Sequence, residues 1–261
     1  MATFNSAMKC RLAAAIFVLA AGIIFADDAQ TKIFAAREET EFHRAQSQYQ
    51  SAPNDDTNAL EFARACFDFA DFATNNDERA ALAKQGIAEC GQWLARESNS
   101  APAHYYLGMN LGQLARTEFI GALKLVKEME REFKTAADLD ATYDFAGPER
   151  NLGLLYRDAP GWPTSIGDQK KALDFLEQAE KLAPDFPENT MNLVESDLQW
   201  NDLARAKKEL AALDALWPAA QKKFAGENWE RDWADWSARR DAARKKLDEL
   251  SPPVKSSKNC R

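Results

Sequence analysis

The sequence has few β-branched aliphatic residues, with only 4 Val and 7 Ile among its 261 positions. β-Strands favour such residues, and the buried strands of a parallel sheet are typically runs of Val and Ile. Alanine, the strongest helix former, occurs 47 times. The composition therefore argues against a β-rich fold, excludes a parallel α/β sheet and predicts an all-α protein.

Residues that carry out chemistry are also scarce. The 4 Cys form neither a CxxC motif nor a cluster with histidine, so no zinc site is indicated. The 2 histidines, His43 and His104, do not stand in a nucleophilic pattern. No Walker-type or Rossmann glycine loop is present, and the net charge of −8 argues against nucleic-acid binding. We therefore expect a protein that is not an enzyme and has no cofactor or metal.

The first 26 residues have the pattern of a secretory signal peptide. Lys9 and Arg11 precede an uncharged apolar stretch at 12–25, and Ala26 is followed by two acidic residues. The alternative is an uncleaved anchor, but this stretch is shorter than the roughly 20 residues that span a bilayer. We therefore expect cleavage after Ala26 and a mature protein in the periplasm or outside the cell, where disulfides persist.

Two segments in the second half of the chain match each other at a displacement of 34 residues, without a gap. Both have the internal spacing 0, +4, +7 and +12, in which the first three positions share one face of a helix. A small residue at the first position lets a neighbouring helix approach closely, and the proline stands where the helix should end. The two sets are Ala172, Leu176, Ala179 and Pro184, and Ala206, Leu210, Leu213 and Pro218.

The remaining sequence extends this helical pattern in both directions. Upstream, we expect a leading helix at 29–51 and a helical hairpin formed by 56–74 and 78–96. Downstream, 228–250 is predicted to be a polar helix that caps the open end of the stack, and the tail 251–261 is predicted to be disordered.

The predicted capping helix carries three tryptophans, Trp229, Trp233 and Trp236, on one face. They could form an aromatic strip for a partner or a membrane, or they could dock the helix on the preceding repeat. The polar residues between them favour docking.

One connection, at 159–168, is too rich in proline and glycine to be helical. Asp168 at its end can cap the following helix. Trp162 within it could be presented as a binding residue, or it could fill the gap between helices in a rigid turn. The prolines on both sides of Trp162 favour the second interpretation.

Cys66 and Cys90 fall on the two helices of the predicted first hairpin. If the hairpin folds about its midpoint, they lie about 7.5 Å out of register along the helix axis, which is marginal for a disulfide. A shift of the turn would bring them together. The sequence leaves open a Cys66–Cys90 disulfide or two buried free thiols.

The run Leu152-Gly153-Leu154-Leu155-Tyr156, followed by the Ala, Leu, Ala and Pro spacing, resembles the tetratricopeptide repeat (TPR). This resemblance implies an α-solenoid of antiparallel helix pairs, forming a single domain at 27–250. More narrowly, 152–187 and 104–116 resemble the TRAP-transporter-associated T-component (TatT) family. That family implies a periplasmic helical protein that partners a solute-binding protein and has an apolar ligand pocket.

The TPR resemblance also implies a concave groove lined by the first helix of each pair. Its expected lining residues are Tyr105, Met109, Gly112, Arg150, Leu154, Arg157, Met191, Glu195 and Leu198. We therefore expect an exported scaffold that binds a protein or peptide segment through this groove. The alternative is a TatT-like subunit that binds an apolar solute, with Tyr105, Tyr106 and Phe133 lining the pocket.

Overall fold

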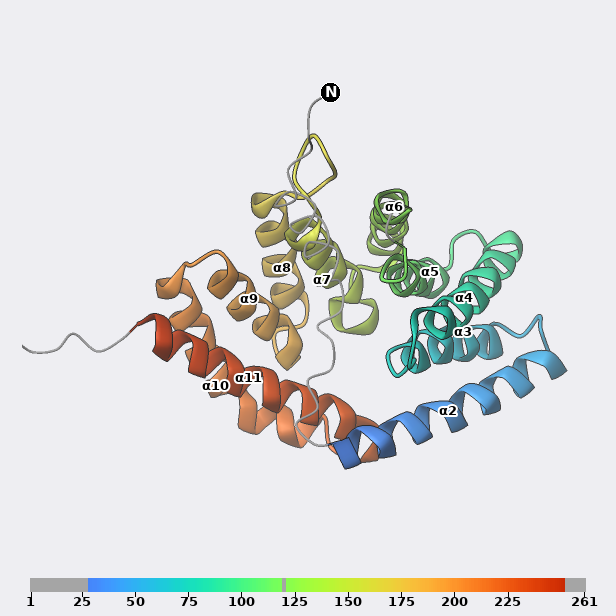
Figure 1. Ribbon diagram of the computed structural model, residues 1–261, viewed down its shortest axis with the longest axis horizontal. Coiled ribbons are helices and arrows are strands. Elements are labelled where there is room, and N and C mark those ends of the chain that lie inside the picture. Colours follow the sequence, from blue (N-terminus) through green and yellow to red (C-terminus); the bar gives the residue numbers. More distant parts are fainter. Residues whose placement is uncertain (1–27, 119–120, 252–261) are drawn as a thin grey trace, which may run out of the picture. The chain divides into compact units, whose positions relative to one another are not determined.

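The computed structural model describes residues 28–118 and 121–251 (Figure 1). These residues form α-helices and one short 3-10 helix, with no strand among them, which confirms the all-α prediction. Within the same residues, no helix is long and apolar enough to cross a membrane. The predicted signal peptide and all but the first residue of the predicted tail lie outside the described ranges.

The helices are α2 (Asp28–Ser51), α3 (Asp56–Ala70), α4 (Asn76–Arg96), α5 (Ala101–Ala115), α6 (Ala122–Asp140), α7 (Tyr143–Asp158), α8 (Gln169–Leu182), α9 (Pro187–Gln199), α10 (Leu203–Lys223), η1 (Glu227–Trp229) and α11 (Glu230–Leu250). The predicted leading helix corresponds to α2, and the predicted first hairpin corresponds to α3 and α4. The described chain forms two compact units that divide between Ala183 and Pro184.

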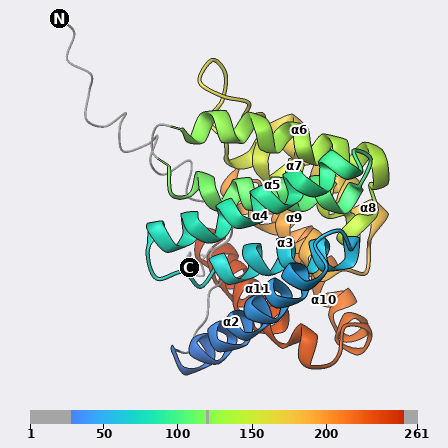
Figure 2. The ribbon, with the colours of Figure 1, turned by 90° about the vertical axis from the view of Figure 1, so that its right-hand side faces the viewer.

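The first unit consists of α2 and three consecutive helix pairs, α3–α4, α5–α6 and α7–α8. Each helix packs against its neighbour in sequence, and α4, α5 and α6 run side by side (Figure 2). The first helices of the pairs also contact one another, since α3 packs on α5 and α5 on α7. This arrangement confirms the predicted stack of antiparallel helix pairs.

Several helices begin at a short polar residue that accepts a hydrogen bond from the first turn, as helix N-caps do. The N-caps with this bond are Asp55, Asn75, Ser100, Asp168 and Asp202. The predicted capping role of Asp168 is therefore confirmed: its carboxylate accepts from the backbone N–H groups of Lys170 and Lys171, at 3.0 and 3.1 Å.

Small residues allow the helices of a pair to pack closely. A Cβ atom on Gly153 of α7 would lie 2.6 Å from Leu176 Cγ of α8, and one on Gly108 of α5 would lie 2.5 Å from the ring of Phe133 in α6. Leu176 and Phe133 are buried. The glycines of the Leu107-Gly108 and Leu152-Gly153 pairs are therefore required by the side chains that pack over them.

The 34-residue register predicts the buried positions but not every helix end. The six apolar members of the two matching segments are all buried, and Pro184 follows the end of α8. Pro218, however, lies inside α10, so the prediction that it ends the helix is wrong. A proline inside a helix costs about 3 kcal/mol. The helix nevertheless continues past the exposed Pro218, and Trp217 and Ala220 on either side of it are buried.

The second unit contains the pair α9–α10, with α11 packed along α9. Trp236 is 1% exposed and is surrounded by the rings of Phe186, Phe224, Trp229 and Trp233, at centroid distances of 5.0–6.4 Å. The tryptophan face therefore packs α11 against the α9–α10 pair. This is the interpretation that the polar residues between the tryptophans favoured.

Candidate functional site

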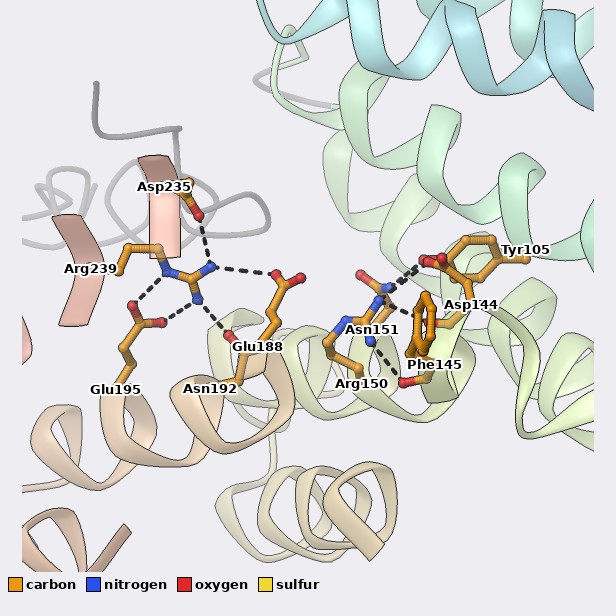
Figure 3. Close-up of polar contacts among 10 residues, drawn as sticks. All are labelled: Tyr105, Asp144, Phe145, Arg150, Asn151, Glu188, Asn192, Glu195, Asp235 and Arg239. Carbon is orange, nitrogen blue, oxygen red and sulfur yellow. Dashed lines mark hydrogen bonds and ion pairs between the residues drawn. The ribbon is translucent and has the colours of Figure 1, made fainter. Parts of the chain in front are cut away.

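Four residues of α5 and α7 form a polar cluster that we call the α5–α7 clasp: Tyr105, Asp144, Arg150 and Asn151 (Figure 3). The Tyr105 hydroxyl donates to Asp144 Oδ2 at 2.7 Å and accepts from Asn151 Nδ2 at 3.3 Å. Tyr105 is 1% exposed. Burial, chiefly, raises the pKa of its hydroxyl well above the usual range, with a smaller contribution from Asp144.

The clasp holds an unusual piece of backbone. Asp144, Phe145 and Ala146 have φ angles of 49°, 55° and 63°, so three consecutive non-glycine residues are left-handed. Each such residue costs on the order of 1–2 kcal/mol. Arg150 donates to the carbonyl oxygens of Phe145 and Asp144, at 3.1 and 3.3 Å, and to the Asp144 carboxylate at 3.3 Å. The guanidinium thereby stabilises the strained turn.

The clasp corrects the predicted groove at two positions. Tyr105 and Arg150 were expected to face a ligand, but both are buried, and Arg150 bonds to the turn of its own helix. The side chain of Arg157 is also only 4% exposed and pairs with Asp158 at 2.7 Å. Gly112 is buried. Burial therefore keeps the side chains of Tyr105, Arg150 and Arg157 from reaching a partner.

The residues expected to line an apolar pocket pack against one another instead. Tyr105 lies 5.2 Å from Tyr106, 6.1 Å from Phe133 and 5.3 Å from Tyr143, measured between ring centroids. Tyr106 and Phe133 are buried. These rings form part of the core of the first unit.

Among the predicted groove positions of the first unit, one remains partly accessible to solvent in both α5 and α7. Met109 of α5 and Leu154 of α7 are half-buried. Met109 lies two residues after Leu107, and Leu154 lies two residues after Leu152. The corresponding residue of α3 is Arg64, whose side chain is 63% exposed and pairs with Asp68 at 3.3 Å. We call Arg64, Met109 and Leu154 the first-helix face.

Arg64 lies close to the neighbouring first helices as well as to solvent. Asp68, first, and then Tyr106 and Asp144 raise the pKa of its guanidinium, while burial lowers it. Arg64 was not among the predicted groove residues, although Pro53 precedes Phe62 by nine residues, just as Pro184 precedes Leu193. That spacing places Arg64 in the register of Met109 and Leu154.

In the second unit, α11 packs on α9, the helix that carries the predicted groove residues. Met191 and Leu198 are buried, at 0% and 4% exposure. Glu195 accepts two hydrogen bonds from Arg239 of α11, at 2.8 and 2.9 Å (Figure 3). The prediction that these three residues line an open groove is therefore wrong, because the C-terminal helix lies against this face of α9.

Trp162 lies in the connection between α7 and α8 and is 89% exposed. The interpretation of Trp162 as a residue that fills a gap between helices is therefore wrong. Hydrogen bonds instead close the base of the loop without the tryptophan, from Gly167 N–H to Pro160 O at 2.9 Å and from Asp168 N–H to Tyr156 O at 3.0 Å.

The groups that carry chemistry in other proteins are enclosed here. Cys66 and Cys90 are buried free thiols, the second of the two alternatives left open by the sequence. Burial, chiefly, raises the pKa of both thiols. His104 contacts Glu132 at 2.6 Å and the Ser98 carbonyl at 3.1 Å, so both ring nitrogens are engaged. No group of three possible metal-ligating side chains occurs within residues 28–118 and 121–251.

Comparison with known proteins adds no family: no protein-family model matches the chain, and no curated protein matches it.

Proposed function

We propose that this protein is an exported, non-enzymatic TPR-like scaffold that binds another protein through its first-helix face. The observation that supports this most directly is the contact between consecutive first helices, α3 with α5 and α5 with α7. Because Arg64, Met109 and Leu154 occupy equivalent positions on these helices, they present one cation and two apolar side chains in series. Such a mixed surface suits a peptide segment with an acidic residue beside apolar ones.

The TatT resemblance suggests a class of partner, a solute-binding protein of the same compartment. The alternative, in which the chain itself binds an apolar solute, has less support. Its proposed lining residues, Tyr105, Tyr106 and Phe133, are packed ring against ring.

The test is a pull-down with the mature chain from an exported-protein extract, comparing wild type with two charge reversals. Arg64→Glu alters the first-helix face. Lys124→Glu is the matched control, because Lys124 lies on the second helix α6, is 85% exposed and, like Arg64, pairs with an acid four residues later.

We expect wild type and Lys124→Glu to retain one stoichiometric partner protein. Arg64→Glu should retain at least 10-fold less of that protein than wild type. Failure to retain any protein would contradict the proposal. Equal retention by the two variants would show that the first-helix face is not the binding surface.

A further inference from the structure

The loop between α7 and α8 is the most exposed apolar feature of the described chain. Trp162 is 89% exposed, whereas the other exposed large apolar residues, Ile33, Leu139 and Leu250, are 40–55% exposed. Figure 1 shows the loop, in yellow, extending beyond the ends of the two helices that it joins. A tryptophan that meets water over most of its surface is unusual in a folded protein, since burying it is strongly favourable.

The loop holds this tryptophan in a defined backbone. Gly161 and Gly167 form a β-bridge at its base, and the N–H groups of Thr164 and Ser165 donate to the Gly161 carbonyl, at 3.1 and 3.3 Å. A Cβ atom on Gly167 would lie 2.0 Å from the Ala159 carbonyl oxygen. The two ends of the loop therefore approach each other more closely than any residue with a side chain would permit. A backbone fixed before binding loses less conformational entropy when it binds.

The loop has an uncharged tip, and two exposed lysines lie at its base beside Asp168, whose carboxylate caps α8. Residues 159–167 carry no charge. Lys170 and Lys171 follow on the exposed first turn of α8, and Lys171 Nζ lies 5.1 Å from the centroid of the Tyr156 ring. A complementary surface therefore has an apolar centre and an acidic rim.

A membrane is the weaker match to this loop. Even a single myristoyl chain supports only marginal membrane binding, with an association constant on the order of 10⁴ M⁻¹, and one tryptophan buries less apolar surface than that chain. The net charge of −8 also opposes binding to anionic lipids. A protein pocket, by contrast, can enclose a tryptophan fully, and tryptophan is among the residues most enriched at binding hot spots.

From these observations we infer that Trp162 is a docking anchor, which inserts into an apolar, acid-rimmed pocket on a partner protein. The inference rests on the proposed function only in requiring a protein partner. The proposed contact lies outside the first-helix face. It uses the Trp162 side chain, which is too exposed to contribute much to the stability of the fold.

The first experiment places the photo-crosslinking residue p-benzoylphenylalanine at position 162 and, in a separate variant, at position 109 of the first-helix face. Both full-length variants are irradiated in the cells that export them, and adducts are identified by mass spectrometry. The inference predicts one discrete protein adduct at 162. A lipid adduct, an adduct with a second copy of this chain, or no adduct at 162 would overturn it.

The two positions separate this inference from the proposed function. An adduct at 162 but not at 109 supports the anchor and contradicts binding through the first-helix face. An adduct at 109 alone does the reverse, and the absence of adducts at both contradicts both.

The second experiment measures the affinity of the crosslinked protein, once purified, for wild type, Trp162→Ala and Trp162→Phe. Thr164→Ala is the control, because Thr164 is exposed on the same loop. Hot-spot truncation weakens binding by about 30-fold or more. We expect that loss for Trp162→Ala, a smaller loss for Trp162→Phe and less than 3-fold for Thr164→Ala, with unchanged thermal unfolding. A Trp162→Ala affinity within 3-fold of wild type would overturn the inference.

Discussion

Arg239 is the residue whose removal should most damage the second unit. Its side chain is 3% exposed and its guanidinium lies among three carboxylates, those of Glu188, Glu195 and Asp235, at 2.8–3.4 Å. It also donates to Asn192 Oδ1 at 2.8 Å. Burial lowers the pKa of Arg239, but the carboxylates, with Glu195 foremost, raise it well above the usual range. The network joins α9 to α11 through charge as well as through packing.

The substitution Arg239→Met keeps most of the side-chain volume and removes the charge. Removing one partner of a buried ion pair costs about 3–5 kcal/mol, because the other charges stay buried without compensation. The carboxylate side chains here are 14–29% exposed, so water can reach them in part. We therefore expect a loss of about 3 kcal/mol, a large share of the 5–15 kcal/mol typical of a domain.

The assay is urea unfolding monitored by tryptophan fluorescence, to which Trp236 and the tryptophans around it contribute. The control is Arg244→Met on the same helix. Arg244 pairs with Asp214 at 2.8 Å, but its side chain is 42% exposed, so we expect a loss of 1 kcal/mol or less. A loss for Arg239→Met that is within 1 kcal/mol of the control would refute the reasoning.

Three further predictions test other parts of the structure. Burial raises the pKa of Asp197 to about 6 against the opposing effect of Arg205, so the contribution of Asp197 to wild-type stability should fall as pH rises from about 4 to 6. Asp197→Asn should remove that component and, by urea unfolding at pH 7, be up to about 3 kcal/mol more stable than wild type; lower stability than wild type at pH 7 would contradict this. Arg150→Lys should destabilise the left-handed turn by about 1–3 kcal/mol, because an ammonium cannot replace the planar guanidinium; an unchanged melting temperature would contradict this. Gly153→Ala should lower stability, whereas Gly91→Ala, with no atom within 4 Å of the new Cβ, should raise it by about 0.5–1 kcal/mol; changes of equal sign would contradict the packing argument.

Local patterns in the sequence predicted the helices and their buried faces well. The positions of Ala172, Leu176 and Ala179 follow directly from helical periodicity, which depends only on the order of residues along one element. The polar residue before a helix, such as Asp168, is a similarly local signal.

Contacts between distant elements were not predictable in the same way. Periodicity places Glu195 on a particular face of α9, but nothing in the spacing shows that Arg239, 44 residues later, covers that face. The turn at Asp144 was missed because it lacks the glycine or asparagine that usually marks a left-handed backbone.

The exposure of Trp162 was also mispredicted, for a physical reason. Proline on both sides of an aromatic residue indicates a rigid turn, and the loop does hold its shape through backbone hydrogen bonds. Rigidity, however, does not determine whether the ring points toward the helices or toward solvent. That choice depends on whether the adjoining helices leave a gap to fill, and α7 and α8 pack closely through Gly153 and Leu176.

The central claim, that this protein works by binding another protein, is tested most directly by native mass spectrometry. The measured quantity is the mass of the intact particle recovered with this chain from an extract of the cells that produce it. We expect a discrete complex whose mass exceeds that of this chain alone by the mass of a second, different polypeptide. A particle with the mass of this chain alone, or of this chain with a lipid-sized molecule, would contradict that expectation.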